Sequence, residues 1–189
     1  MNRTVWIAVF VAAMLVPPSF GAEKLKADKS CLAVAVGSKQ HLTSKGNNDD
    51  EREFEGGATS FSATKVLDIE FAIVFSTKVA EQFTNAHVVE FRLYTPQGNL
   101  YESLSIPITN SQSRAGERHR VPGYPELIPV QVLKSINHGG GRGLFAKVTV
   151  PVAGTPIVNN SLYGKWKAEA VVEDELAPCS IPATFTITE

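Results

Sequence analysis

The chain has 189 residues, of which 43% are hydrophobic and 20% charged, with 18 basic and 19 acidic side chains, 14 Gly and only 2 Cys. This composition fits one folded domain, and it excludes a disordered chain, a coiled coil, a collagen-like rod and a small disulfide-rich knot. The near-balance of charge also argues against a dedicated nucleic-acid binder, because neutralising phosphates requires an excess of Lys and Arg.

The N-terminal residues have the pattern of an export signal. Arg3 is followed by an uninterrupted apolar run over residues 5–16, and then by two prolines and a group of small residues. Such a run rises about 18 Å as a helix, short of a hydrocarbon core roughly 30 Å thick, so we expect a cleaved signal peptide over residues 1–22 rather than a membrane anchor. We expect residues 23–189, which contain no candidate transmembrane span, to be secreted or periplasmic.

The two cysteines follow the predicted signal peptide, at Cys31 and Cys179. An even pair in an exported chain is most simply one disulfide, and this one would join the two ends of the domain. A reactive thiol pair is the alternative, but the two residues lack the C-x-x-C spacing of a redox motif.

Alternation of apolar and polar residues with a period of two recurs along the chain, whereas helical periodicity does not. In residues 165–173, for example, Trp166 and three small apolar residues alternate with Lys and Glu, which predicts an inward-facing Trp166. Leu67 begins a similar inward-facing row. Only residues 77–86 could hold a helical turn. The seven to eight strands that we expect cover residues 32–36, 65–75, 87–94, 100–108, 128–133, 144–152, 165–173 and 183–187.

Short strands without crossover helices predict an all-β, antiparallel sandwich of two sheets, because each half-polar strand must bury one face. We expect one such domain over residues 23–189, with long loops at about 38–64 and 109–127. If every strand reverses the one before, the connections 109–127 and 153–162 lie at one end, and connection 135–143 lies at the other.

The segment Leu162-Tyr163-Gly164-Lys165-Trp166 precedes the last two predicted strands. This arrangement resembles bacterial-type exported immunoglobulin-like and fibronectin-like domains, in which a Tyr at the start of the penultimate strand ties a corner to the backbone. The resemblance implies an immunoglobulin-like architecture. It implies no functional residue, and the two cysteines lie too far apart to be the inter-sheet pair of antibody domains.

Local catalytic motifs are absent: there is no G-x-S-x-G elbow, H-E-x-x-H pair, phosphate-binding loop or EF-hand spacing. The four His residues, at 41, 87, 119 and 138, lie in unrelated segments, although a composite site from separate loops stays open. The Gly-rich run 138–143 and the acidic run 49–55 are more typical of a flexible connection and a solvated loop than of an anion or Ca²⁺ site. We therefore expect no enzyme activity, no cofactor and no metal.

The second long loop carries the best candidate for a binding surface. Arg114, Arg118, His119 and Arg120 crowd a polar stretch, and Tyr124 lies between two prolines. Long loops in compact domains are often functional, and this combination favours an anionic partner.

The sequence thus predicts a non-catalytic module that recognises a protein or envelope component through its end loops or an edge strand. The first alternative is a carbohydrate-binding module, which needs a flat aromatic platform such as an outward pair of Tyr94 and Tyr101. The second is a small secreted enzyme with a loop-built site, for which a pocket lined by several titratable groups including a His would be the evidence.

Overall fold

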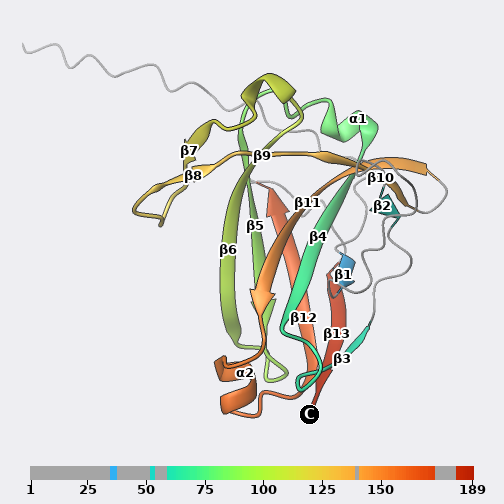
Figure 1. Cartoon of the computed structure of the whole chain (residues 1–189), viewed down its shortest axis with the longest axis vertical. Coiled ribbons are helices and arrows are strands. Elements are labelled where there is room, and N and C mark those ends of the chain that lie inside the picture. Colours follow the sequence, from blue (N-terminus) through green and yellow to red (C-terminus); the bar gives the residue numbers. More distant parts are fainter. Residues whose placement is uncertain (1–34, 38–51, 54–58, 139–140, 173–181) are drawn as a thin grey trace, which may run out of the picture.

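The computed structural model describes residues 35–37, 52–53, 59–138, 141–172 and 182–189. Strands dominate these residues, and the all-β class is confirmed (Figure 1). The strands are β1 Ala35–Gly37, β2 Arg52–Glu53, β3 Ser60–Ser62, β4 Asp68–Ser76, β5 His87–Tyr94, β6 Leu100–Thr109, β7 Arg118–Arg120, β8 Leu127–Pro129, β9 Gln131–Val132, β10 Lys134–His138, β11 Gly141–Pro151, β12 Gly164–Val172 and β13 Ala183–Thr188. The helices are α1 Thr77–Ala80 and α2 Pro156–Asn159, with a 3-10 turn, η2, at Gln112–Arg114.

Two sheets pack against each other around a shared core. One sheet has the order β1-β4-β11-β10-β2, and the other has the order β3-β13-β12-β5-β6-β9. The strands β7 and β8 form a separate two-stranded ribbon that projects from one end of the molecule (Figure 1). The core between the sheets draws apolar side chains from both of them, from β4 and β11 on one side and from β5, β12 and β13 on the other.

Alternation correctly identified the inward faces of β5 and β12. Val89, Phe91 and Leu93 are buried in β5, and Trp166 is 1% exposed in β12. The Trp166 ring stacks on Phe185 with the ring centres 6.2 Å apart, and its indole Nε1 donates a hydrogen bond to the Leu162 carbonyl at 2.9 Å. The buried indole is thus both packed and hydrogen-bonded, and it joins β12 to the core and to the segment before the strand.

β4 departs from the half-buried strand that its sequence predicts. Every residue from Ile69 to Phe75 is buried, because its outer face also packs, in a second cluster of Ala72, Val74, Ile136 and Phe145. Leu67, expected to face inward, lies just before the strand and is 77% exposed. The prediction for Leu67 is wrong because the strand begins one residue later, at Asp68.

The chain forms more strands than the seven to eight expected, because several pairings span only two or three residues and carry no periodic pattern. Residues 128–133, expected as one strand, divide between β8 in the ribbon and β9 in the six-stranded sheet. Three short pairings are parallel rather than antiparallel, those of β2 with β10, β3 with β13 and β6 with β9. The described parts of the two expected long loops contain β2, β3, η2 and β7.

The expected distribution of connections between the two ends is wrong in two places. Gly143 pairs with Ser76 at the start of α1, so the β10–β11 connection lies at the same end as the ribbon. α2 lies at the opposite end, beside the β5–β6 hairpin, where Gly164 approaches Pro96 (Figure 1). The error arises because the chain between β6 and β10 stays at one end instead of crossing the sheet.

Other expectations concern residues that the structure does not describe. Cys31, Cys179 and the predicted signal peptide over residues 1–22 all lie outside the described residues, so the disulfide and the export signal stay predictions. Within the described residues the Tyr163 hydroxyl has no hydrogen-bond partner, and the corner is held instead by Trp166. No helix in the described part of the chain has the length and apolar character needed to cross a bilayer.

Candidate ligand-binding site

The ribbon is a hairpin that leaves both sheets and folds back over one of them. Arg118 pairs with Pro129, and Arg120 pairs with Leu127. Gly123 supplies a positive φ of 83° in the connection between the two strands, and Tyr124 N donates to the Val121 carbonyl at 3.2 Å. Because a positive φ is easily reached only by glycine, Gly123 allows the chain to turn tightly above the sheet.

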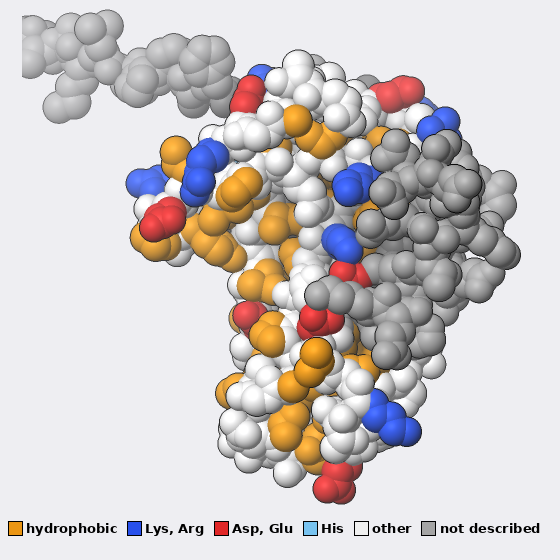
Figure 2. Space-filling view, viewed as in Figure 1, with side chains coloured by type: hydrophobic (Ala, Val, Ile, Leu, Met, Phe, Trp, Pro, Cys, Tyr) orange, Lys and Arg blue, Asp and Glu red, His pale blue; other side chains and the backbone are white. Residues whose placement is uncertain are grey.

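A cavity of about 660 Å³ lies between this turn and the outer face of the six-stranded sheet. Figure 2 shows the molecule hollowed beneath the projecting ribbon. Its floor comes from β5, β6 and β12, and its roof from the turn of the ribbon. The lining residues are Val88, Glu90, Arg92, Ser103, Ser105, Val121, Pro122, Gly123, Tyr124 and Val171.

Tyr124 anchors the roof to the floor. Its hydroxyl oxygen accepts a hydrogen bond from the backbone N–H of Ser105 at 3.0 Å. The ring is half-buried, and the neighbouring Val121 is buried, so the turn is held by packing as well as by this bond. The turn that forms the roof of the cavity is therefore held in a fixed position.

The floor carries one carboxylate and one guanidinium in direct contact. Arg92 Nη2 donates to Glu90 Oε2, and the Ser103 hydroxyl donates to Glu90 Oε1 at 2.5 Å. The hydrogen bond from Arg92 is the main cause that lowers the pKa of Glu90; the Ser103 bond and the charge of Arg92 act the same way, and partial burial opposes them. Glu90 is therefore ionised at neutral pH, and the two charges cancel.

The three arginines predicted as a binding surface make hydrogen bonds within the chain. Arg114 contacts Glu117 at 3.0 Å and Asn85 at 3.1 Å. Arg118 donates twice to the Leu127 carbonyl, at 3.1 and 2.7 Å, and Arg120 donates to the Pro125 carbonyl at 2.9 Å. The three bonds of Arg118 and Arg120 tie β7 to the rest of the ribbon.

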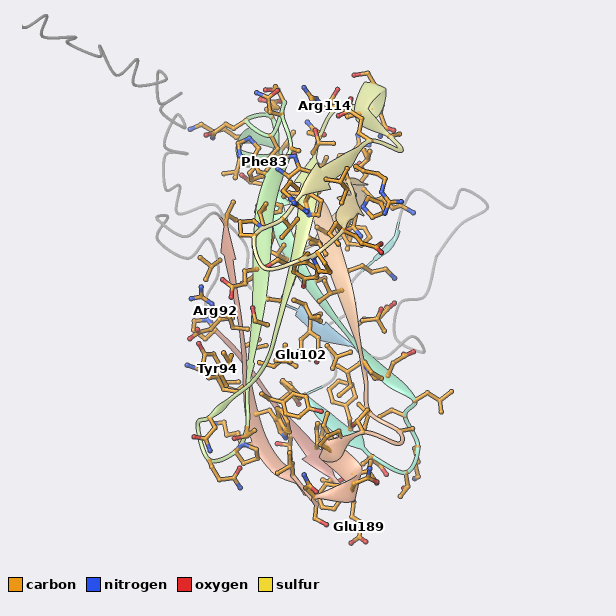
Figure 3. The ribbon with its side chains drawn as sticks, turned by 90° about the vertical axis from the view of Figure 1, so that its left-hand side faces the viewer. Phe83, Arg92, Tyr94, Glu102, Arg114 and Glu189 are labelled. Atoms are coloured by element: carbon orange, nitrogen blue, oxygen red, sulfur yellow. The ribbon has the colours of Figure 1, made fainter. Side chains whose placement is uncertain are left out.

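Of the five predicted site residues, only Tyr124 lines the cavity. Arg118, His119 and Arg120 form β7 of the ribbon, and Arg114 lies in the turn η2 before it. Figure 3 places Arg114 at the end of the molecule and Arg92 farther down, on the flank of the sheet. The structure thus brings the ribbon residues together, with Arg114 separated from the cavity.

The aromatic pair considered for sugar binding does not form a platform. Tyr101 packs edge-on against Trp166, with the ring centres 5.2 Å apart, so it faces the core. Tyr94 faces outward, and its ring is covered by Lys167 Nζ at 4.2 Å from the ring centre. Burial is the main cause that raises the pKa of Tyr94, with a further contribution from the nearby Glu169. The expectation of an outward pair is wrong for Tyr101, because a bulge in β6 alters the alternation there.

The free edge of β6 runs beside the cavity. Among the described residues β6 pairs with β9 only at Ile108 and Thr109, and residues 100–107 have no strand paired on that side. Above this segment the Gln131 side chain bridges the two sheets, accepting from Lys147 N at 2.9 Å and donating to its carbonyl at 3.3 Å. The open part of the edge therefore begins below Gln131 and passes the cavity.

Sequence reasoning missed Glu90, Arg92, Ser103 and Ser105. Alternation placed all four on the outward face of their strands, where polar residues are expected whether or not they bind anything. The signal that distinguishes them is tertiary, because they become a floor only when the ribbon folds over them.

Neither the family models nor the curated proteins include a match to this chain. The inferences about its function therefore rest on the geometry of the site.

Proposed function

We propose that the protein is an exported, non-catalytic binding module of immunoglobulin-like architecture, which recognises a partner protein through the end that carries the β7–β8 ribbon. The observation that supports this most is the cavity, because a projecting hairpin with a fixed roof and an open side is a common form of recognition surface. Export, which the N-terminal sequence predicts, is part of the same proposal.

The architecture is supported by two packed sheets around a buried Trp166, with most neighbouring strands antiparallel. The ribbon residues predicted as a binding surface have a structural place in the proposal. Arg118 and Arg120 hold the ribbon in shape through backbone carbonyls, and His119 lies half-buried between them. A change of these arginines would therefore alter the roof of the cavity as well as the surface charge.

The cavity that the described residues form lacks the features that would favour an enzyme or a carbohydrate-binding module. Its lining contains a carboxylate, a guanidinium and a phenol, without the His that would favour an enzyme site. Tyr94 and Tyr101 do not offer the shared flat surface that would favour a sugar. The protein-binding proposal needs neither feature.

Site-specific photocrosslinking in the cells that produce the protein tests this proposal. A photoreactive amino acid at Pro122, which is exposed and lines the cavity, should give an adduct with one specific protein. The matched control is the same probe at Gln97, exposed in the hairpin at the opposite end, which should give none. Absence of a protein adduct at Pro122, or equal adducts at both positions, would contradict the proposal.

A further inference from the structure

We propose that the cavity beneath the ribbon takes the uncharged side-chain amide of an Asn or Gln of the partner, in preference to an ionised side chain. This inference rests on the proposed function and adds the chemical class of the group that is bound. On this inference, the partner is recognised by hydrogen bonds inside the cavity instead of by the surface charge of the arginines.

The first step of the argument is the charge of the cavity. Glu90 and Arg92 contact each other directly, and no other lining residue carries a formal charge at neutral pH. An incoming ion of either sign meets one attractive and one repulsive charge in the lining, while it gives up its own hydration. An uncharged group avoids that desolvation cost.

The second step is the set of donors and acceptors left over. Tyr124 Oη accepts from Ser105 N, so its own O–H remains as a donor. The Ser105 hydroxyl has no partner among the described residues. One oxygen of Glu90 accepts a bond from Arg92 and the other accepts a bond from Ser103, and each has a further lone pair. The cavity thus offers donors and acceptors together, which matches the C=O and N–H of an amide.

The third step is the shape of the walls and the continuation of the cavity. Val88, Val171 and Pro122 are apolar, and they suit the flat faces of an amide and the stem that carries it. The Ser105 N–H points away from β5, toward Tyr124. Residues two positions apart in a strand direct their N–H groups to the same side, so the Ser103 N–H also points to the free edge of β6. A partner polypeptide that extends from the cavity along β6 can therefore accept a hydrogen bond from the Ser103 N–H, which favours a polypeptide ligand over a sugar.

Three probes with the same backbone test the class of ligand by NMR on the isotope-labelled protein: the N-acetyl N-methylamides of glutamine, glutamate and lysine. We expect the glutamine probe to cause saturable shifts at the amides of Ser103, Ser105 and Gly123, with no shift at Gln97. The two charged probes should bind at least about fivefold more weakly. Equal or tighter binding of either charged probe, or no saturable shift with the glutamine probe, would overturn the proposal.

Two variants link the result to the named groups. Tyr124→Phe keeps the ring but removes both the O–H donor and the acceptor of the Ser105 N–H, and it should weaken binding of the glutamine probe at least about fivefold. Glu90→Gln removes the carboxylate charge that contacts Arg92, so the glutamate probe should bind more tightly than it does to the wild type. Tyr163→Phe, at a hydroxyl without a partner in the described residues, is the matched control and should leave all three affinities unchanged. If Tyr124→Phe or Glu90→Gln binds the probes as the wild type does, the proposal is wrong.

The crosslinking experiment separates this inference from the proposed function. If the adduct at Pro122 forms equally well in the wild type and in Tyr124→Phe, the partner binds at this end without using the cavity, and only the amide inference fails. If no adduct forms at Pro122, the proposed function fails by itself.

Discussion

The hydroxyl of Tyr124 accepts a hydrogen bond from the backbone N–H of Ser105 at 3.0 Å, and this bond ties the turn of the ribbon to the sheet beneath it. The N–H belongs to the free edge of β6, where a neighbouring strand would otherwise supply a carbonyl. The Tyr124 hydroxyl therefore replaces the carbonyl of a neighbouring strand at this one position of the edge. The same contact sets the height of the roof above Glu90 and Arg92.

Tyr124→Phe should destabilise the protein by about 1 kcal/mol, because it removes one hydrogen bond and leaves the part-buried N–H of Ser105 without its partner. Urea unfolding followed by Trp166 fluorescence measures the change. Tyr163→Phe should lower the free energy of unfolding by much less. Equal effects of the two substitutions would mean that the bond to Ser105 contributes nothing.

The ionisation of Glu90 should make stability depend on pH in a defined direction. Its folded-state pKa lies below the ordinary value of 4.5, chiefly because of the hydrogen bond from Arg92. The ionised form therefore stabilises the fold at neutral pH, and this contribution is lost as the pH falls below about 4.5. Between pH 7 and pH 3, the urea midpoint of the wild type should fall further than that of Glu90→Gln. Parallel pH profiles would show that Glu90 has the same pKa in the folded and unfolded protein.

A buried ion pair in the other sheet should matter more for stability than an exposed one. Lys147 Nζ lies 2.6 Å from Glu70 Oε1, and Glu70 is 4% exposed. Its other carboxylate oxygen has no hydrogen-bond partner among the residues that the structure describes. Lys147→Met should therefore cost about 2–3 kcal/mol, because it leaves an uncompensated buried charge.

The matched control for that substitution is Lys167→Met. The pair of Lys167 with Glu169 is more exposed, so its loss should cost about 1 kcal/mol or less. The double substitution of Glu70 and Lys147 by Met should recover most of the stability lost in Lys147→Met. Failure to recover it would assign the loss to packing of the lysine stem instead of to the charge on Glu70.

The export prediction has a direct chemical test. Protein recovered from the medium or periplasm of the producing cells should begin at Ala22 or Glu23 and should contain a Cys31–Cys179 peptide pair under non-reducing digestion. Mass spectrometry reports both features at once. An intact N-terminus, or two free thiols in the exported protein, would contradict the corresponding prediction.

The strands that could be predicted from sequence are the long ones with one buried face. β5 and β12 alternate apolar and polar residues along their whole length, and Trp166 lies in the core as the pattern indicates. A tight turn joins β5 to β6, with Gly98 at a positive φ of 83°. In these segments the local pattern and the tertiary environment agree.

The remainder depends on contacts that no local pattern records. β4 is covered on both faces, and residues 128–133 change from the ribbon to the sheet within one predicted strand. The cavity itself exists because Tyr124 reaches Ser105 across the sheet, a pairing between residues 19 positions apart. Tyr124 was identified because of its unusual position between two prolines, whereas Glu90 and Arg92 looked like any solvent-facing pair.

The salt dependence of the Pro122 crosslink tests the central claim most directly. Raising the ionic strength from about 0.05 M to about 0.5 M shortens the screening length severalfold and weakens contacts between exposed charges. If an uncharged amide is bound in the cavity, the adduct yield should change by less than about twofold. A loss of tenfold or more would instead show that contacts between exposed charges carry the binding, as an anionic partner on the arginines would require.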